Sequence, residues 1–146
     1  MENKLLNILL KKLNLDIKNV DKEKIHKLDY NEGIQFVIQI GNQLQILIKK
    51  GYYVSKLSKN DIEKVYISNS YEKNYYFIIK NFKFFLPIKK SDDKELIIKQ
   101  MYYMLANLCL DLMSIKNIKE LEPSKLYYML KRMTEKDLEK REYIFI

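Results

Sequence analysis

Hydrophobic and polar positions recur with a helical period through the segment GIQFVIQIGNQLQILIKKG, residues 33–51. At 100° per residue, its Gln, Asn and Lys side chains fall mostly on one arc of roughly 120°. Asp29 with Glu32 matches a capping box, and Gly51 follows two lysines where a helix can end. These end signals favour a helix from about Tyr30 to Lys50. The alternative is a β-hairpin over 34–48 with a loop at 41–43, which gives an equally clean apolar register.

The flanking segments predict two more helices and a sheet. Residues 2–13 and 21–28 have helical apolar spacing, and Asp21 can cap the second. Residues 62–68, 74–79 and 82–86 then predict a three-stranded antiparallel meander over about 62–86. A two-residue turn at Lys80-Asn81 would place Ile79 opposite Phe82 and give the sheet one apolar face.

The C-terminal third predicts helices. Ser91-Asp92-Asp93 can cap a long helix over about 92–115, whose polar stripe is so narrow that several sides must be covered. It is therefore either the central core element or a surface covered by a partner. Pro123 predicts a helix over 122–132, and Thr134 with Asp137 predicts a further short one. The expected fold is α+β, in a single domain of residues 1–146.

Composition limits the cellular setting. The longest apolar block, Met101 to Leu110, is far shorter than the ~20 residues that span a bilayer. The N-terminal residues lack the pattern of a signal peptide. We therefore expect a cytoplasmic protein without a membrane partner.

The charge is distributed unevenly. The formal net charge is +8, and all of the excess lies in residues 1–90, where lysine predominates. Abundant Ile, Asn, Lys and Tyr are also typical of an AT-rich genome, so the lysine excess has a second explanation. A one-sided basic surface predicts binding to nucleic acid, a ribonucleoprotein or an acidic protein.

The candidate contacts for such a partner flank the predicted cap at Gly51 and the predicted sheet. Tyr76, beside Phe85 on one sheet face, is the candidate stacking residue for a nucleobase. The candidate basic residues are Lys49, Lys50, Lys56, Lys59, Lys64, Lys83, Lys89 and Lys90.

Residues for catalysis are scarce. The chain has one histidine, His26, between lysines, and one cysteine, Cys109, within an apolar block. These cannot form an ordinary His/Cys zinc site, and the three glycines match no phosphate-binding loop. The sequence therefore predicts a non-catalytic binding protein with no cofactor and no metal.

A different class of binding protein is also consistent with the sequence. A small inhibitor or assembly subunit from a virus or mobile element would use the apolar helix at 92–115 to bind a protein or a second copy of itself. The apolar C-terminal tail, residues Tyr143, Ile144, Phe145 and Ile146, would belong to the same interface.

Overall fold

The computed structural model describes residues 2–15, 21–69 and 72–142, so the predicted interface at Tyr143–Ile146 lies outside the described residues. The fold is α+β, as predicted. Its elements in chain order are α1 (Glu2–Leu13), β1 (Lys22–Lys24), α2 (Tyr30–Lys49), β2 (Tyr52–Val54), η1 (Lys59–Asp61), β3 (Ile62–Asn69), β4 (Glu72–Ile79), β5 (Phe85–Pro87), α3 (Lys94–Leu112), η2 (Ile118–Leu121) and α4 (Lys125–Met133).

The segment at 30–50 is a helix, and the alternative hairpin at 34–48 is wrong. The Asp29 side chain accepts from the Glu32 N–H at 2.8 Å, and the Glu32 side chain accepts from the Asp29 N–H at 3.1 Å. Gly51 has φ of 91° just after the C-cap, a left-handed conformation that glycine adopts at little cost. The capping box and the glycine stop therefore decide the structure of this segment.

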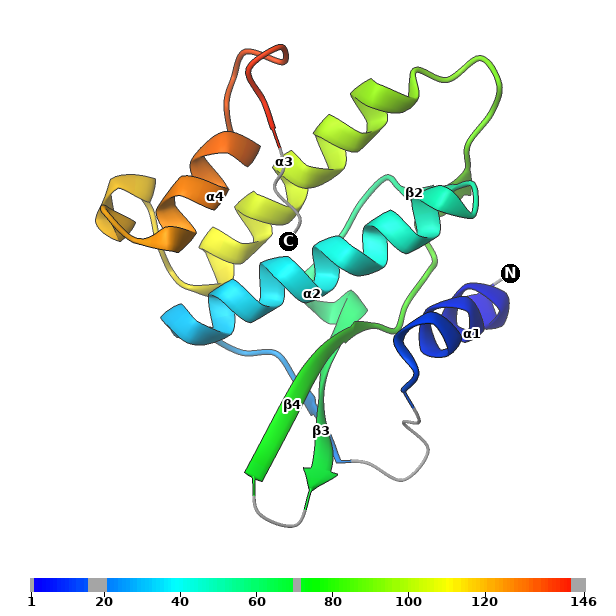
Figure 1. Ribbon diagram of the computed structural model, residues 1–146, viewed down its shortest axis with the longest axis horizontal. Helices are drawn as coiled ribbons and strands as arrows, with labels where there is room; N and C mark the ends of the chain where they lie inside the picture. The colour runs from blue at the N-terminus through cyan, green and yellow to red at the C-terminus, as the bar shows by residue number, and fades with distance from the viewer. Residues whose placement is uncertain (1, 16–20, 70–71, 143–146) are drawn as a thin grey trace.

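Helix α2 is the central element of the fold. In Figure 1 it crosses the middle of the molecule, with α3 and α4 on one side and the β3–β4 hairpin on the other. It contacts α1, α3, α4, β2 and β4. One continuous apolar core contains residues from all four helices and from both sheets, with Phe36, Phe77 and Tyr102 fully buried.

The sheet has three antiparallel strands, but its membership differs from the predicted meander. Strands β3 and β4 pair as expected, with Ile62 opposite Ile79. The third strand is β1, which pairs with β3 so that Lys22 lies opposite Val65. The predicted helix at 21–28 is therefore wrong, because this segment supplies the strand that β3 needs on its other edge.

The predicted turn at Lys80-Asn81 does not return the chain to β4. The main-chain N–H groups of both residues donate to the Asp61 carbonyl, and the Asn81 amide donates to the Asp61 carboxylate at 2.9 Å. These bonds direct the chain away from the sheet, and Phe82 and Phe85 enter the core with ring centroids 5.1 Å apart. Strand β5 then pairs with β2 in a separate two-stranded sheet, called here the ribbon.

Helix α3 is a core element, so other elements of the fold cover its apolar circumference. It is capped by Asp93 and contacts α2, α4 and β2. The α4 helix begins after Ser124, later than expected, and Pro123 precedes it rather than entering its first turn. The short helix predicted at Thr134 is wrong, because α4 ends at Met133 and the following residues form turns, in which the Lys140 and Arg141 N–H groups donate to the Asp137 carbonyl.

The exposed edge of β4 is closed by side chains of α2. The Phe77 N–H donates to the Gln39 side chain at 2.8 Å, and the Gln43 amide donates to the Phe77 carbonyl at 2.7 Å. The Gln43 carbonyl oxygen also accepts from the Ile79 N–H at 2.9 Å. Two glutamines therefore take the place of a neighbouring strand along this part of the edge.

Candidate functional site

The register of the ribbon brings together lysines that are far apart in the sequence. Tyr52 lies opposite Pro87 and Val54 opposite Phe85. The pairing continues beyond both strands, since the Ile88 N–H donates to the Gly51 carbonyl at 2.8 Å and the Ser55 N–H donates to the Phe84 carbonyl at 2.9 Å. Seven of the eight predicted lysines, called here the ribbon lysines, flank the two strands along the chain: Lys49, Lys50, Lys89 and Lys90 at one end, Lys56 and Lys83 at the other, and Lys59 further along in η1.

One end of the ribbon, called here the Phe84 end, has two cations over one aromatic ring. The ammonium groups of Lys56 and Lys83 lie 5.5 Å and 5.6 Å from the centroid of the partly exposed Phe84 ring. The nearby carboxylate of Asp61 faces inward, with 5% of the residue exposed, and it accepts from Ser58 and Asn81. The two lysines therefore face solvent beside an aromatic surface.

The other end, called here the Gly51 end, combines two lysine pairs. Lys49 and Lys50 end α2, where a positive charge complements the helix dipole. The Lys4 ammonium of α1 joins them, 5.9 Å from the centroid of the Tyr52 ring. The main-chain N–H of Lys89 donates to the Asp92 carboxylate at 2.7 Å, so one acidic group lies at this end. The Gly51 end is therefore basic, and the charge of Asp92 offsets part of its positive charge.

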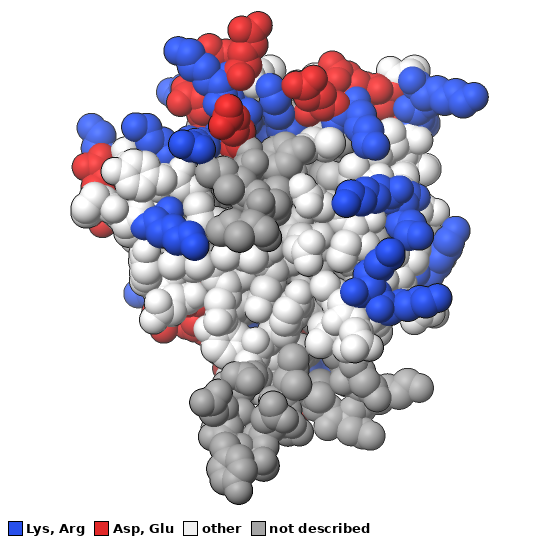
Figure 2. All heavy atoms as spheres, in the orientation of Figure 1, with Lys and Arg blue, Asp and Glu red and all other residues white. Residues whose placement is uncertain are grey.

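None of the seven ribbon lysines forms an ion pair within the described part of the chain. The ion pairs there join Lys64 to Glu32, Lys80 to Glu63, Lys99 to Glu95 and Arg132 to Glu142. Figure 2 shows basic side chains gathered at the right, on the side where α1 and the C-terminal end of α2 lie in Figure 1, with no acidic side chain among them in this view. The ribbon lysines thus supply positive charge that no described acidic side chain pairs with.

Lys64 does not belong to this surface. It lies on the sheet face toward α2, where its ammonium group is 2.8 Å from the Glu32 carboxylate and 4.2 Å from the centroid of the Tyr75 ring. Burial lowers the pKa of Lys64, but the hydrogen bond and the charge of Glu32 together outweigh it and leave the pKa above its usual value. Lys64 is therefore a structural cation, and its predicted role as a contact is not supported.

Tyr76 and Phe85 do not form the predicted stacking surface. Tyr76 lies opposite Val65, so it is on the other sheet face from Lys64. Its side chain is partly buried, and this burial raises the pKa of the Tyr76 hydroxyl despite a hydrogen bond with Gln43. Phe85 is buried in the core. The partly exposed aromatic residue between basic groups is Phe84 instead.

The two residues with the most reactive side chains do not approach each other in a recognisable catalytic arrangement. His26 is exposed on the segment after β1, whereas Cys109 is buried on α3. Among the residues that the structure describes, no three His, Cys, Asp or Glu side chains are grouped closely enough to hold a metal ion.

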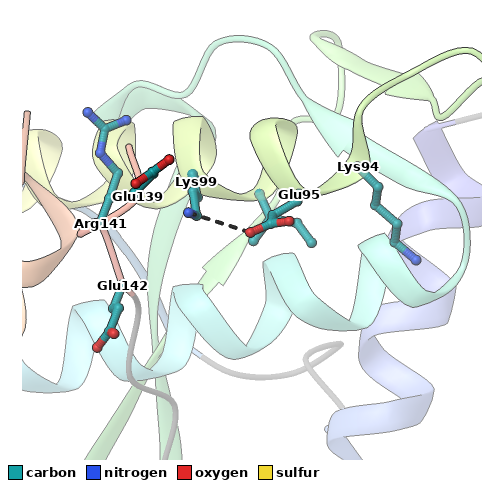
Figure 3. A pocket seen from close by; sticks show the side chains of 7 residues that line it. Lys94, Glu95, Lys99, Glu139, Arg141 and Glu142 are labelled. Carbon is teal, nitrogen blue, oxygen red and sulfur yellow. Dashed lines mark ion pairs between the residues drawn. The ribbon is translucent and has the colours of Figure 1, made fainter. Parts of the chain in front are cut away.

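A hollow of about 710 Å³ lies between the first half of α3 and residues 139–142. Figure 3 shows Lys99 and Glu95 pointing toward one another along α3, on one wall of the hollow, and their charged atoms are 3.5 Å apart. Basic and acidic side chains alternate around this hollow, and Arg141 is held by the Tyr103 ring and the Glu135 carbonyl. Its charges offset one another, so it is a weaker site for an anion than the ribbon.

The sequence does contain a signal for the ribbon, which an analysis of neighbouring segments misses. The segments KKGYYVSK, residues 49–56, and KFFLPIKK, residues 83–90, carry the same classes of residue in opposite order. Each has a lysine pair, an aromatic pair and a single lysine, and antiparallel pairing brings the two lysine pairs to one end and the two single lysines to the other. Lys4, Phe84 and Tyr52 complete the surface and were not predicted.

Two further findings bear on the class of protein. Among the described helices, none has both the length and the apolar character needed to cross a bilayer. Comparisons with protein-family models, curated proteins and solved structures gave no match, so the site's own geometry is the basis for assigning a function.

Proposed function

We propose that this protein is a non-catalytic nucleic-acid-binding protein that contacts phosphates through the lysines at the two ends of the ribbon. The observation that carries the proposal is the β2–β5 register, which gathers seven lysines from two distant segments, none of them in an ion pair with a residue that the structure describes. The exposed positions of all seven support it as well.

The energetics of the Phe84 end favour an anionic ligand. The ammonium groups of Lys56 and Lys83 both lie beside one ring, so their positive fields add at a ligand bound there. A bound phosphate would pair with these charges and release counterions, and that release makes binding tighter at low salt. The Phe84 ring adds an apolar face on which a base can stack.

Salt dependence tests this proposal directly. Fluorescence anisotropy with a labelled oligonucleotide would be measured across a range of salt concentrations. With about four phosphate contacts, affinity for a single strand should fall roughly 50-fold between about 50 and 200 mM salt. An affinity that does not change with salt, or no binding at the lowest salt, would contradict phosphate recognition.

Charge reversal locates the surface. The double variant Lys56→Glu/Lys83→Glu should weaken binding by more than about tenfold at low salt and reduce the slope of the salt dependence. The matched control is Lys116→Glu/Lys125→Glu, which makes the same change in net charge at exposed positions outside the ribbon. Equal losses in both variants would mean that overall charge, and not the ribbon, drives binding.

The alternative of a protein-binding inhibitor or assembly subunit has less support. Its predicted helix at 92–115 is covered by other elements, and most of the apolar residues of α3 are at least partly buried. A protein that stays bound in host extract through nuclease treatment and high salt would favour this alternative over nucleic-acid binding.

A further inference from the structure

A small hollow lies between the ribbon and α3, close to the Phe84 end. Its walls are the β2 side together with apolar side chains of α3, and its volume is about 160 Å³. The lining residues are Tyr53, Val54, Ser55, Ile97, Gln100, Met101 and Met104. At ~30 Å³ per water this is the space of about five waters, well below the roughly 300–1,000 Å³ of pockets for drug-sized ligands.

The walls of the hollow suit a flat ring. Tyr53 is partly exposed and offers an aromatic face. The sulfur-containing side chains of Met101 and Met104 are polarisable and make favourable contacts with aromatic rings. Met101 also fixes the ribbon against α3, because its sulfur accepts the Val54 N–H at 3.4 Å.

The rim of the hollow has one uncommitted polar side chain. Gln100 is exposed, and its amide forms no hydrogen bond with any described residue. An amide supplies both a donor and an acceptor, which matches the edge of a nucleobase. A hollow that has both apolar and polar walls fits a ligand with apolar faces and a polar edge.

Ser55 connects the hollow to the cations. It lines the hollow, its N–H donates to the Phe84 carbonyl at 2.9 Å, and its hydroxyl donates to the same carbonyl at 3.1 Å. Ser55 is followed directly by Lys56, whose ammonium group lies beside the Phe84 ring together with that of Lys83, so the hollow and the two cations are separated by the width of one strand. A ligand that occupied both would need a flat ring attached to a neighbouring anion.

We infer that this hollow holds one unpaired nucleobase, so the protein binds single-stranded nucleic acid in preference to a duplex. The inference rests on the proposed function, because the lysines of the ribbon must bind the adjoining phosphates. A base inside a duplex is stacked and paired and cannot enter the hollow without being turned out, which costs free energy.

The test compares three labelled ligands of equal length by fluorescence anisotropy: a thymidine oligonucleotide, the same oligonucleotide without bases, and a duplex. The first two carry the same phosphates, so any difference between them reports on base contacts. The thymidine strand should bind at least about tenfold more tightly than the abasic strand, which is the size expected from stacking one or two bases. It should also bind more tightly than the duplex.

Two variants assign this preference to the hollow. Met104→Trp fills the space without changing charge, and Gln100→Ala removes the free amide at an exposed position. Both should reduce the preference for thymidine over the abasic strand and leave abasic binding unchanged. Gln35→Ala, at an exposed position early in α2, is the matched control and should leave the preference intact. Circular dichroism confirms that each variant is folded.

The outcomes separate the two proposals. Salt-sensitive binding with equal affinity for thymidine and abasic strands, or tighter binding of the duplex, would overturn the base site and leave the phosphate-binding surface standing. A base preference that survives Met104→Trp would also overturn it, because the base would then bind elsewhere. Absence of binding to every ligand at low salt would overturn the proposed function and the base site together.

Discussion

Burial changes the chemistry of single residues, and Cys109 illustrates how. Its side chain is fully buried, with the sulfur 3.6 Å from the Gly33 carbonyl and 3.8 Å from the Met113 sulfur. Burial raises the pKa of the Cys109 thiol from 9.0 to about 12, since a thiolate would lose its hydration there. The folded protein therefore keeps this proton at a pH where the unfolded chain releases it.

The raised pKa predicts a pH dependence of stability. The contribution of Cys109 is fully present below pH 9 and is lost as the pH rises from 9 toward 12. Between pH 9 and pH 10, the free energy of unfolding of the wild-type protein should fall by about 1 kcal/mol more than that of Cys109→Ala. Urea denaturation at the two pH values measures this difference. Parallel behaviour of the two proteins would show that the thiol is more hydrated than the structure indicates.

At the scale of elements, the contact between α2 and β4 shows a helix completing a sheet. Gln43 is fully buried, and its amide forms two hydrogen bonds with the main chain of the β4 edge. This explains why the apolar α2 sequence carries glutamines on the side toward the sheet. The glutamines are spaced as on a helix face, but they bond the main-chain groups of β4 that a neighbouring strand would otherwise bond.

Replacing Gln43 therefore tests a structural role for a polar side chain. The Gln43→Leu variant leaves the Phe77 carbonyl and the Ile79 N–H without a partner, and each loss costs about 1–3 kcal/mol. We expect the free energy of unfolding to fall by about 2–5 kcal/mol in urea denaturation. Gln35→Leu, at an exposed position of the same helix, should change it by less than about 0.5 kcal/mol.

The elements with local end signals could be predicted from the sequence, and those defined by distant partners could not. The capping box at Asp29 and the glycine at 51 predicted α2, and the alternation of apolar and polar residues predicted β3 and β4. Strands β1 and β5 have three residues each, too few to show a period. The structure of β1 and β5 depends on pairing with β3 and β2. The turn predicted at 80–81 was wrong because the only evidence for it was that it would give the sheet an apolar face.

The same reasoning explains which of the candidate residues the fold brings together. Exposed lysines next to a predicted helix end and turn can be chosen from sequence, and seven of the eight lie by the ribbon. Lys64 lies apart from them because it is paired with Glu32 of another element. Phe84 was missed because the incorrect register placed it on the apolar face of the sheet.

At the scale of the whole molecule, lysines divide into those that stabilise the fold and those that remain available. Lys64 has 17% of its side chain exposed and is paired with Glu32, whereas Lys83 is exposed and has no ion pair among the described residues. Lys64→Met should lower the free energy of unfolding by about 1–2 kcal/mol, because it leaves a partly buried carboxylate without its partner.

The complementary variant Lys83→Met should change stability by less than about 0.5 kcal/mol and weaken oligonucleotide binding. Urea denaturation and anisotropy on both variants separate the two roles. If Lys64→Met weakened binding as much as Lys83→Met without loss of stability, the division between paired and available lysines would be incorrect.

The glutamine contacts on β4 also affect how copies of this protein behave toward one another in a crowded solution. An open strand edge is a template on which another chain can add its own strand, and repeated addition leads to fibrils. Gln39 and Gln43 occupy the main-chain groups of Phe77 and Ile79 that such a strand would use. Separation of α2 from β4 would therefore expose unpaired main-chain groups to which another strand can bind, before the protein unfolds completely. We expect the packing of α2 on β4 to limit aggregation.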